Sequence, residues 1–236
     1  MISYFNQKGT LFTKEDSLTA TVIDHLKYLP DELFLQILSN SLYNDGRLKI
    51  EGQKIISVDY WVKWTAEFPR VESMQDSLPL QNSEFVEPDV FIQLTDYDII
   101  IEAKRWDRKG QDVDQIKREI LAYLKENEAD NIKPFCLIQL GGLNSLGKET
   151  YYDIPIYKTD WSKMLSEIVS TSKKLKNTKS TIYNNAPQIQ RVLDDLIIGL
   201  SLHRFLQLEW LDSFQIRNPL DLQNINLKKM FSYASE

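Results

Sequence analysis

Hydrophobic residues recur at helical spacing near the start of the chain and predict two helices there. Thr13 is placed to cap the first helix, with Asp16 as the acidic residue of a capping box. Pro30 ends this helix, and Asp31 begins a second one that stops before the turn-forming residues 44–46. The apolar positions of the pair are Leu18, Val22, Leu26 and Leu29, then Leu33, Leu35, Ile37, Leu38 and Leu42. The two helices are expected to form a hairpin.

The pattern changes to alternation between Lys54 and Trp64, which predicts one long strand. The polar residues 66–86 include two prolines and predict a long loop. Pro88 suits the first residue of the next strand, because proline has no N–H to give to a ladder. Asp89 is therefore expected at the start of that strand.

A tight turn at 96–98 and the β-branched run that follows predict a second strand, paired with the first as a hairpin. Side chains alternate between the two faces of a strand. Ile99, Ile101 and Ala103 should therefore point to one face, and Ile100, Glu102 and Lys104 to the other. In such a hairpin Asp89 can lie close to Glu102, which brings three charged groups together at one edge of an apolar sheet.

Helices and strands alternate in the rest of the chain. The expected elements are a helix capped by Asp112, a strand at 135–140 ending in Gly141 and Gly142, a short strand at 154–157 and a helix at 161–169. The strand–helix–strand order predicts a right-handed crossover. The polar, basic segment 171–181 predicts a linker, and apolar spacing at 189–211 predicts one long or broken helix.

These elements predict an α/β fold with a mixed four- to five-stranded sheet flanked by helices, followed by an added C-terminal helical segment. The main domain is expected at 1–170, and a helical extension packed on it at 182–236. A chain of 236 residues with 42% hydrophobic content is long enough for such a core.

Composition narrows the classes of function. We find no signal peptide and no apolar run long enough to span a membrane, so the expected compartment is the cytoplasm. Cys136 is the only cysteine and is interpreted as a small buried hydrophobic residue. A net charge of -6 argues against binding nucleic acid through bulk charge, so any such binding must be local.

Pro88, Asp89, Glu102 and Lys104, together with this order of elements over about residues 13–140, resemble the PD-(D/E)XK nuclease superfamily. The resemblance implies a restriction-endonuclease-like core in which Asp89, Glu102 and Lys104 are catalytic. A glutamate on the first helix and a glutamine on the helix after the lysine often join the site in that superfamily. The matching positions are Glu15 and Gln115, with Glu32 as a second candidate for the glutamate.

Two carboxylates that face a phosphodiester would repel it, so they imply a divalent cation, and oxygen ligands suit Mg²⁺ or Mn²⁺. Asp89, Glu102 and Glu15 are the candidate metal ligands. Lys104 would orient the attacking water or stabilise charge that develops on the phosphate. Gln115 would hold Lys104 or the water through its amide. Each residue also has a structural alternative, from an ordinary surface ion pair to a helix-terminal carboxylate.

Basic and aromatic residues near the proposed site are candidates for contacts with nucleic acid. The candidates for phosphate contacts are Arg105, Arg108, Lys109, Lys117 and Arg118, which could equally form a solvated charged face. Trp61, Trp64 and Trp106 could stack on bases, although aromatic residues on strands are more often part of the core. His25 and His203 have no partner at ligand spacing and are interpreted as structural or surface residues.

The leading hypothesis is a Mg²⁺-dependent nuclease that acts on DNA, in restriction, phage defence, a mobile element or repair. The competing hypothesis is a catalytically inactive nuclease-fold module that binds nucleic acid or a partner protein. A homodimer, or a role as one subunit of a larger complex, is a third hypothesis. No membrane partner is expected.

Overall fold

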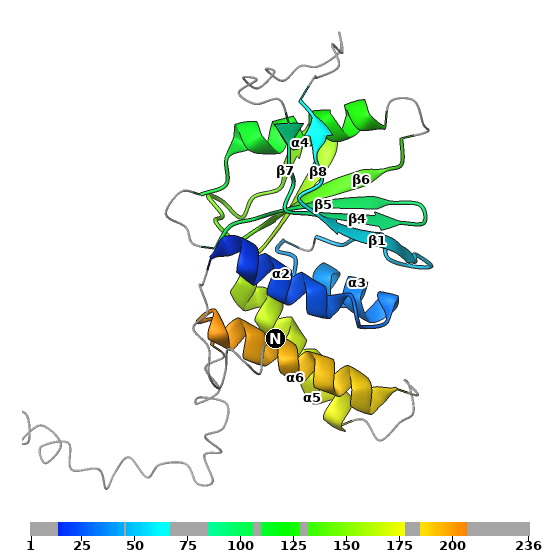
Figure 1. Cartoon of the computed structure of the whole chain (residues 1–236), viewed down its shortest axis with the longest axis vertical. Coiled ribbons are helices and arrows are strands. Elements are labelled where there is room, and N and C mark those ends of the chain that lie inside the picture. Colours follow the sequence, from blue (N-terminus) through cyan, green and yellow to red (C-terminus); the bar gives the residue numbers. More distant parts are fainter. Residues whose placement is uncertain are drawn as a thin grey trace, which may run out of the picture. The chain divides into compact units, whose positions relative to one another are not determined.

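Apolar residues dominate the central strands of a mixed sheet. The computed structural model describes residues 14–44, 46–66, 85–105, 110–127, 132–177 and 185–206. Within these residues six strands form one sheet, in the order β1-β4-β5-β6-β8-β7 (Figure 1). Their bounds are β1 Ile55–Tyr60, β4 Val90–Leu94, β5 Asp98–Ala103, β6 Phe135–Leu140, β7 Glu149–Tyr151 and β8 Ile154–Thr159.

Strand direction changes across the sheet. β1, β4 and β5 pair antiparallel, which confirms the predicted hairpin of β4 and β5. β5, β6 and β8 are parallel, and β7 returns antiparallel to β8. The predicted α/β class with a mixed sheet is confirmed. The predicted four to five strands are too few, because the three-residue strand β7 is too short to show an alternating pattern.

The first strand ends earlier than predicted. Trp61 has a positive φ of 49°, and this left-handed conformation turns the chain out of the ladder after Tyr60. The following residues Trp64–Thr65 form β2, which pairs with β3, Phe85–Val86, in a separate two-stranded sheet. The prediction of one strand through Trp64 is therefore wrong. Most of the predicted loop lies outside the described residues, but its last two residues belong to β3.

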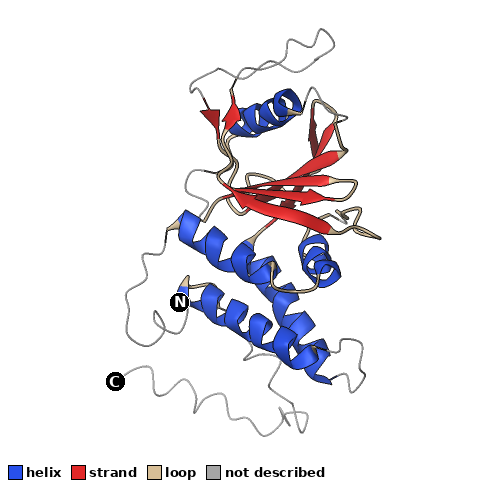
Figure 2. Ribbon diagram, turned by 45° about the vertical axis from the view of Figure 1, so that its right-hand side comes forward, coloured by secondary structure: helices blue, strands red, loops and turns tan. Residues whose placement is uncertain are grey.

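Helices cover both faces of the sheet (Figures 1 and 2). Helix α4, Val113–Glu126, lies on one face, and helices α2, Glu15–Leu26, and α3, Asp31–Asn40, lie on the other. Alternation along β5 explains the two layers. Ile99 and Ile101 belong to the core cluster that includes α2 and α3, whereas Ile100 belongs to the cluster that includes α4. The predicted division of β5 between two faces is confirmed.

The last two described helices extend the core beneath α2. Helix α5, Trp161–Asn177, contacts α3, and helix α6, Ala186–Leu202, packs against both α2 and α5. α6 shares one core cluster with the sheet through buried apolar residues, which are Ile189, Leu193, Leu196 and Leu200. α6 lies within the predicted C-terminal helical segment, and it belongs to the same compact unit as the sheet.

Several predicted helix limits need correction. Helix α2 begins at Glu15, and its N-cap is Lys14 rather than Thr13, which lies outside the described residues. Helix α5 continues to Asn177, so the predicted linker at 171–181 is wrong over its first seven residues. Helix α6 ends at Leu202, well before the predicted position 211. The predicted cap of α4 is confirmed, because the Asp112 side chain accepts a hydrogen bond from the Asp114 N–H.

Among the described helices, none is long and apolar enough to cross a membrane.

Candidate active site

Asp89 lies directly before β4, where the hairpin places it beside β5. Val90 pairs with Ile101, so Asp89 stands across from Glu102. The Asp89 Oδ2 atom accepts a hydrogen bond from the backbone N–H of Ala103 at 2.8 Å. This bond fixes the carboxylate at the end of β5, and only 8% of Asp89 is exposed. The predicted proximity of the two acidic residues is confirmed.

Lys104 follows the last residue of β5 and joins two of the predicted acidic residues. Its Nζ atom donates to Glu102 Oε1 and lies 3.5 Å from Glu15 Oε1. Burial disfavours the charged amine, but the negative charges of Glu102, Glu15 and Asp89 outweigh this effect and raise the pKa of Lys104. Lys104 is therefore an ammonium ion at neutral pH.

The backbone around Lys104 is held by a close approach of two strands. The Lys104 N–H donates to the Leu140 carbonyl at 2.8 Å, and its carbonyl accepts from the Trp161 indole N–H at 2.9 Å. A Cβ atom on Gly141 would come within 2.1 Å of the Lys104 carbonyl oxygen, and Gly142 is similarly close to the Lys104 side chain. The paired glycines after β6 thus leave space for Lys104.

Glu15, rather than Glu32, is the glutamate that reaches the site. Its Oε2 atom accepts a hydrogen bond from the Arg105 backbone N–H at 2.8 Å, and its other oxygen faces Lys104. Glu32 is exposed in the first turn of α3. Because Glu15 is the first residue of α2, its carboxylate also lies where a helix favours negative charge.

Gln115 enters the site from the first turn of α4 and contacts Glu102. Its Nε2 atom donates to Glu102 Oε1 at 2.7 Å and to Glu119 Oε1 at 3.1 Å. The predicted amide contact to Lys104 is not what the structure shows, since the amide holds the carboxylate instead. Gln111 supports the same region, donating to the carbonyls of Glu102 at 3.2 Å and Gly141 at 2.9 Å.

Glu119 is a site residue that sequence reasoning missed. It is fully buried one helical turn after Gln115, on the face of α4 that covers Glu102. The available signal was a glutamate among the inward positions Ile116, Ile120 and Tyr123 of an amphipathic helix. Burial and the negative charge of Glu102 raise the pKa of Glu119 well above its ordinary value, although the hydrogen bond from Gln115 opposes this.

Glu119 should make stability depend on pH. A carboxyl group whose pKa is raised by folding lowers stability as pH rises above its ordinary pKa. We expect Glu119→Gln to be more stable than the wild type at pH 8 by about 1 kcal/mol or more, and to differ little at pH 4. Urea unfolding at both pH values measures this difference. A variant less stable than the wild type at pH 8 would show that Glu119 is instead held as a stabilising carboxylate.

Four carboxyl groups gather at this site with the ammonium of Lys104. Glu15 and Glu102 contact Lys104, and Asp89 also acts on its charge, whereas Glu119 interacts with Glu102. Burial raises the pKa of Asp89 to about 7, and the charge of Glu102 contributes to the shift. The Oε2 atoms of Glu102 and Glu119 are buried, and the raised pKa of Glu119 arises partly from its interaction with the Glu102 carboxyl. Once these groups are ionised, their oxygen atoms are ligands that suit a hard cation such as Mg²⁺ or Mn²⁺.

The described part of the chain nevertheless contains no group of three or more acidic, histidine or cysteine side chains already arranged around a metal position. The Lys104 ammonium lies between Glu102 and Glu15 and serves as their counter-charge. Glu102 is almost wholly buried, whereas the side chains of Lys104 and Glu15 are 21% and 34% exposed. The site is therefore open to solvent on the side of Lys104 and Glu15.

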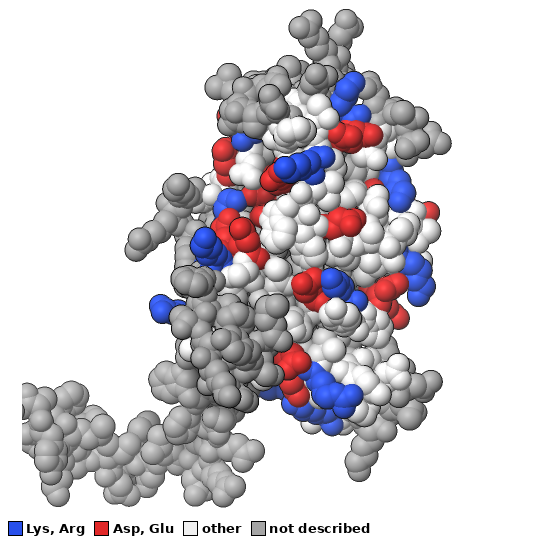
Figure 3. Space-filling model, in the orientation of Figure 1, with Lys and Arg blue, Asp and Glu red and all other residues white. Residues whose placement is uncertain are grey.

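The predicted phosphate-binding residues are mostly not directed at solvent. The Arg105 guanidinium donates to the buried carbonyl of His203 at 2.9 Å, which links the end of α6 to the site. The Lys117 ammonium lies over the Tyr151 ring, and Arg118 pairs with Asp112 at 4.0 Å. Arg108 and Lys109 lie outside the described residues. On the face in Figure 3, acidic and basic side chains are interspersed.

The other residues singled out by sequence fall into two groups. Trp64, Cys136 and His203 are buried, which confirms the core interpretation of Cys136 and makes Trp64 part of the aromatic cluster with Phe91 and Tyr123. His25 contacts the carbonyl of Thr21 within its own helix at 2.7 Å. Trp61 is 39% exposed. Trp106 lies outside the described residues.

The fold and site define a mixed α/β protein with a buried cluster of carboxylates around one lysine. No family model matches the chain, and no solved structure matches it. The chain is 27% identical over 237 residues to the uncharacterized protein PM0110 of Pasteurella multocida. That alignment covers 92% of this chain and 84% of that protein, so the similarity extends over nearly the whole length of both.

Proposed function

We propose that this protein is a metal-dependent nuclease with a restriction-endonuclease-like core, which hydrolyses phosphodiester bonds in DNA. The observation that carries the proposal is the ion pair of Lys104 with Glu102 at the end of β5, with Asp89 across the hairpin and Glu15 at the start of α2. Restriction, phage defence, mobile-element transfer and repair are all settings in which such an enzyme acts.

The chain supplies the ligands and the charges for this reaction. Asp89, Glu102 and Glu15 would hold Mg²⁺ or Mn²⁺, which when bound polarises the scissile phosphate and lowers the pKa of a coordinated water. Lys104 remains protonated because its pKa is raised, so it acts by stabilising negative charge on the phosphate and not as a base. Gln115 and Gln111 keep Glu102 and its backbone in place.

Plasmid cleavage with purified full-length protein tests the proposal. We expect supercoiled plasmid to be converted to nicked or linear forms with Mg²⁺ or Mn²⁺, and to stay intact with EDTA, because the carboxylates alone repel the phosphate. Cleavage that is unaffected by EDTA would contradict the role of a metal. If plasmid, single-stranded DNA and RNA all remain uncleaved with both metals, the proposed nuclease activity is contradicted.

The same ion pairs support the competing function. Because Lys104 already neutralises Glu102 and Glu15, the cluster is also consistent with an inactive module that binds nucleic acid or a partner protein. Metal-independent binding of DNA without cleavage would support this alternative.

A further inference from the structure

Trp61 has an unusual backbone conformation beside the proposed site. Its φ of 49° is one that bulky residues rarely adopt, and such strain often marks functional positions. The Trp61 N–H points at the carbonyl oxygen of Asp89, 3.4 Å away. Trp61 is therefore attached, through its own backbone, to the residue that carries one of the site's carboxylates.

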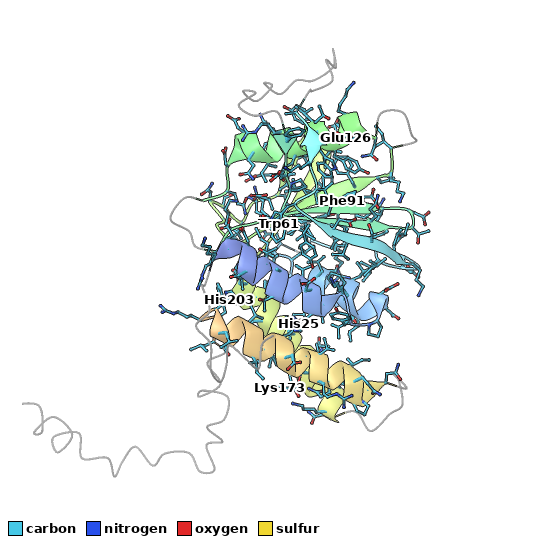
Figure 4. The ribbon with its side chains drawn as sticks, in the orientation of Figure 1. His25, Trp61, Phe91, Glu126, Lys173 and His203 are labelled. Atoms are coloured by element: carbon cyan, nitrogen blue, oxygen red, sulfur yellow. The ribbon has the colours of Figure 1, made fainter. Side chains whose placement is uncertain are left out.

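The indole of Trp61 remains accessible, unlike that of Trp64. Trp61 is 39% exposed, whereas Trp64 is 5% exposed. The Trp61 ring contacts Tyr60 at a centroid distance of 5.6 Å, and the Tyr60 hydroxyl donates to Asp24 Oδ1 at 3.0 Å. Tyr60 thus supports the indole from one side. Figure 4 places Trp61 where β1 ends, and the Tyr60 contact to Asp24 brings this end of β1 to the last turn of α2.

A second exposed aromatic residue precedes Asp89 in the chain. Phe85 in β3 is 50% exposed, and the Lys63 ammonium lies 5.8 Å from the centre of its ring. The chain passes from β3 through Glu87 and Pro88 to Asp89. Phe85 is therefore four residues from Asp89 in the chain, and Lys63, which faces its ring, also pairs with Glu87 at 3.4 Å.

We propose that Trp61 stacks on an unpaired base next to the phosphate bound at Asp89 and Lys104, so that the substrate is single-stranded or locally unpaired nucleic acid. This inference rests on the proposed function. Bases inside a duplex are already stacked on their neighbours, so an exposed indole finds a free base face only where the strand is unpaired. An aromatic ring accepts every base in this way, which implies little sequence preference at that nucleotide.

Binding to fluorescent oligonucleotides tests the stacking contact separately from cleavage. Fluorescence anisotropy with Ca²⁺, an oxygen-seeking cation like Mg²⁺, compares an oligothymidylate with an abasic strand of the same length. We expect wild-type protein to bind the strand with bases about ten-fold more tightly or better, since one stacked base contributes roughly 1–3 kcal/mol. Trp61→Ala should lose that preference and leave the affinity for the abasic strand unchanged. Trp61→Phe should retain most of it.

Ile132→Ala is the matched control. Ile132 is an apolar residue with a similar exposed fraction, 43%, and it precedes β6. Because β5 and β6 are parallel, it lies at the end of the sheet opposite Lys104, so its loss should change neither affinity. Trp61→Gly is a second variant, because glycine accepts a positive φ and preserves the turn if alanine perturbs folding. Circular dichroism and thermal unfolding check both variants.

The proposal is overturned if wild-type protein does not bind the oligothymidylate or binds both strands equally. It is also overturned if Trp61→Ala and Trp61→Gly retain the preference, or lose affinity for abasic and duplex DNA to the same extent. Cleavage measured in parallel separates the two ideas. If the protein shows a base preference that depends on Trp61 but does not cleave, only the proposed nuclease activity is contradicted. If it cleaves but shows no such preference, only the proposed stacking contact is contradicted.

Discussion

Replacing Lys104 with alanine should lower the rate of phosphodiester cleavage by about 100-fold or more, the usual cost of losing a preorganised charge that stabilises a transition state. The lysine follows β5, and its ammonium is fixed by Glu102 and Glu15. Alanine has no ammonium group, so the negative charge that develops on the phosphate would no longer be stabilised by a positive charge.

Lys133→Ala provides the matched control for this experiment. Lys133 also pairs with a carboxylate of β5, since its Nζ lies 3.6 Å from Asp98 Oδ1, but it is at the opposite end of the strand. Both variants lose a partly buried ion pair, so both report the general effect of such a loss on folding. Initial rates of plasmid cleavage with Mn²⁺ should fall only for Lys104→Ala. Equal cleavage rates for the two variants would show that Lys104 has no specific role in the reaction.

Asp89 should make the protein less stable as pH rises when no divalent cation is present. Its pKa of about 7 in the folded protein exceeds the ordinary value of 3.8, so the folded state binds more protons than the unfolded state between these values. This loss of folding stability is absent below the ordinary pKa of 3.8. It is complete above the pKa of about 7 that Asp89 has in the folded protein. Its size is about 4 kcal/mol if Asp89 titrates alone.

Asp89→Asn isolates this effect, because the amide oxygen can still accept the Ala103 hydrogen bond and carries no charge. Urea unfolding in EDTA from pH 4 to pH 9 should show that the variant gains stability over the wild type as pH rises. Adding Mg²⁺ at pH 8 should stabilise the wild type more than the variant, because a cation binds the ionised carboxylate. Parallel pH profiles for the two proteins would show that Asp89 is ionised throughout.

The local pattern of the sequence was sufficient for the central part of the site. Alternation along Ile99, Ile100 and Ile101 assigned Glu102 to the face of the sheet opposite α2 and α3. The turn before this strand placed Asp89 close to Glu102. These features depend on neighbours within about 15 residues, where the geometry of a hairpin leaves few alternatives. Gln115 was expected on a different ground, because the resembled PD-(D/E)XK superfamily often has a glutamine on the helix that follows the lysine.

Contacts between distant segments determine what the local pattern of the sequence leaves open. Glu119 reads as an ordinary helix residue until α4 is packed over Glu102, and only that packing makes it a buried acid. Arg105 was expected to contact phosphate, but the end of α6, about a hundred residues later, provides a buried carbonyl for it. Lys117 is likewise turned toward Tyr151. The position of α6 was not encoded in any pattern near the site.

The sequence by itself determined the order of helices and strands, the two faces of β5 and the set of charged groups at its end, because side-chain periodicity and turn residues act over short distances. Only the tertiary structure decided that Glu15 rather than Glu32 faces Lys104, that Trp61 leaves the ladder with its indole exposed, and that two buried acids share Gln115. These outcomes depend on how separate elements pack, which the spacing of residues along the chain does not specify.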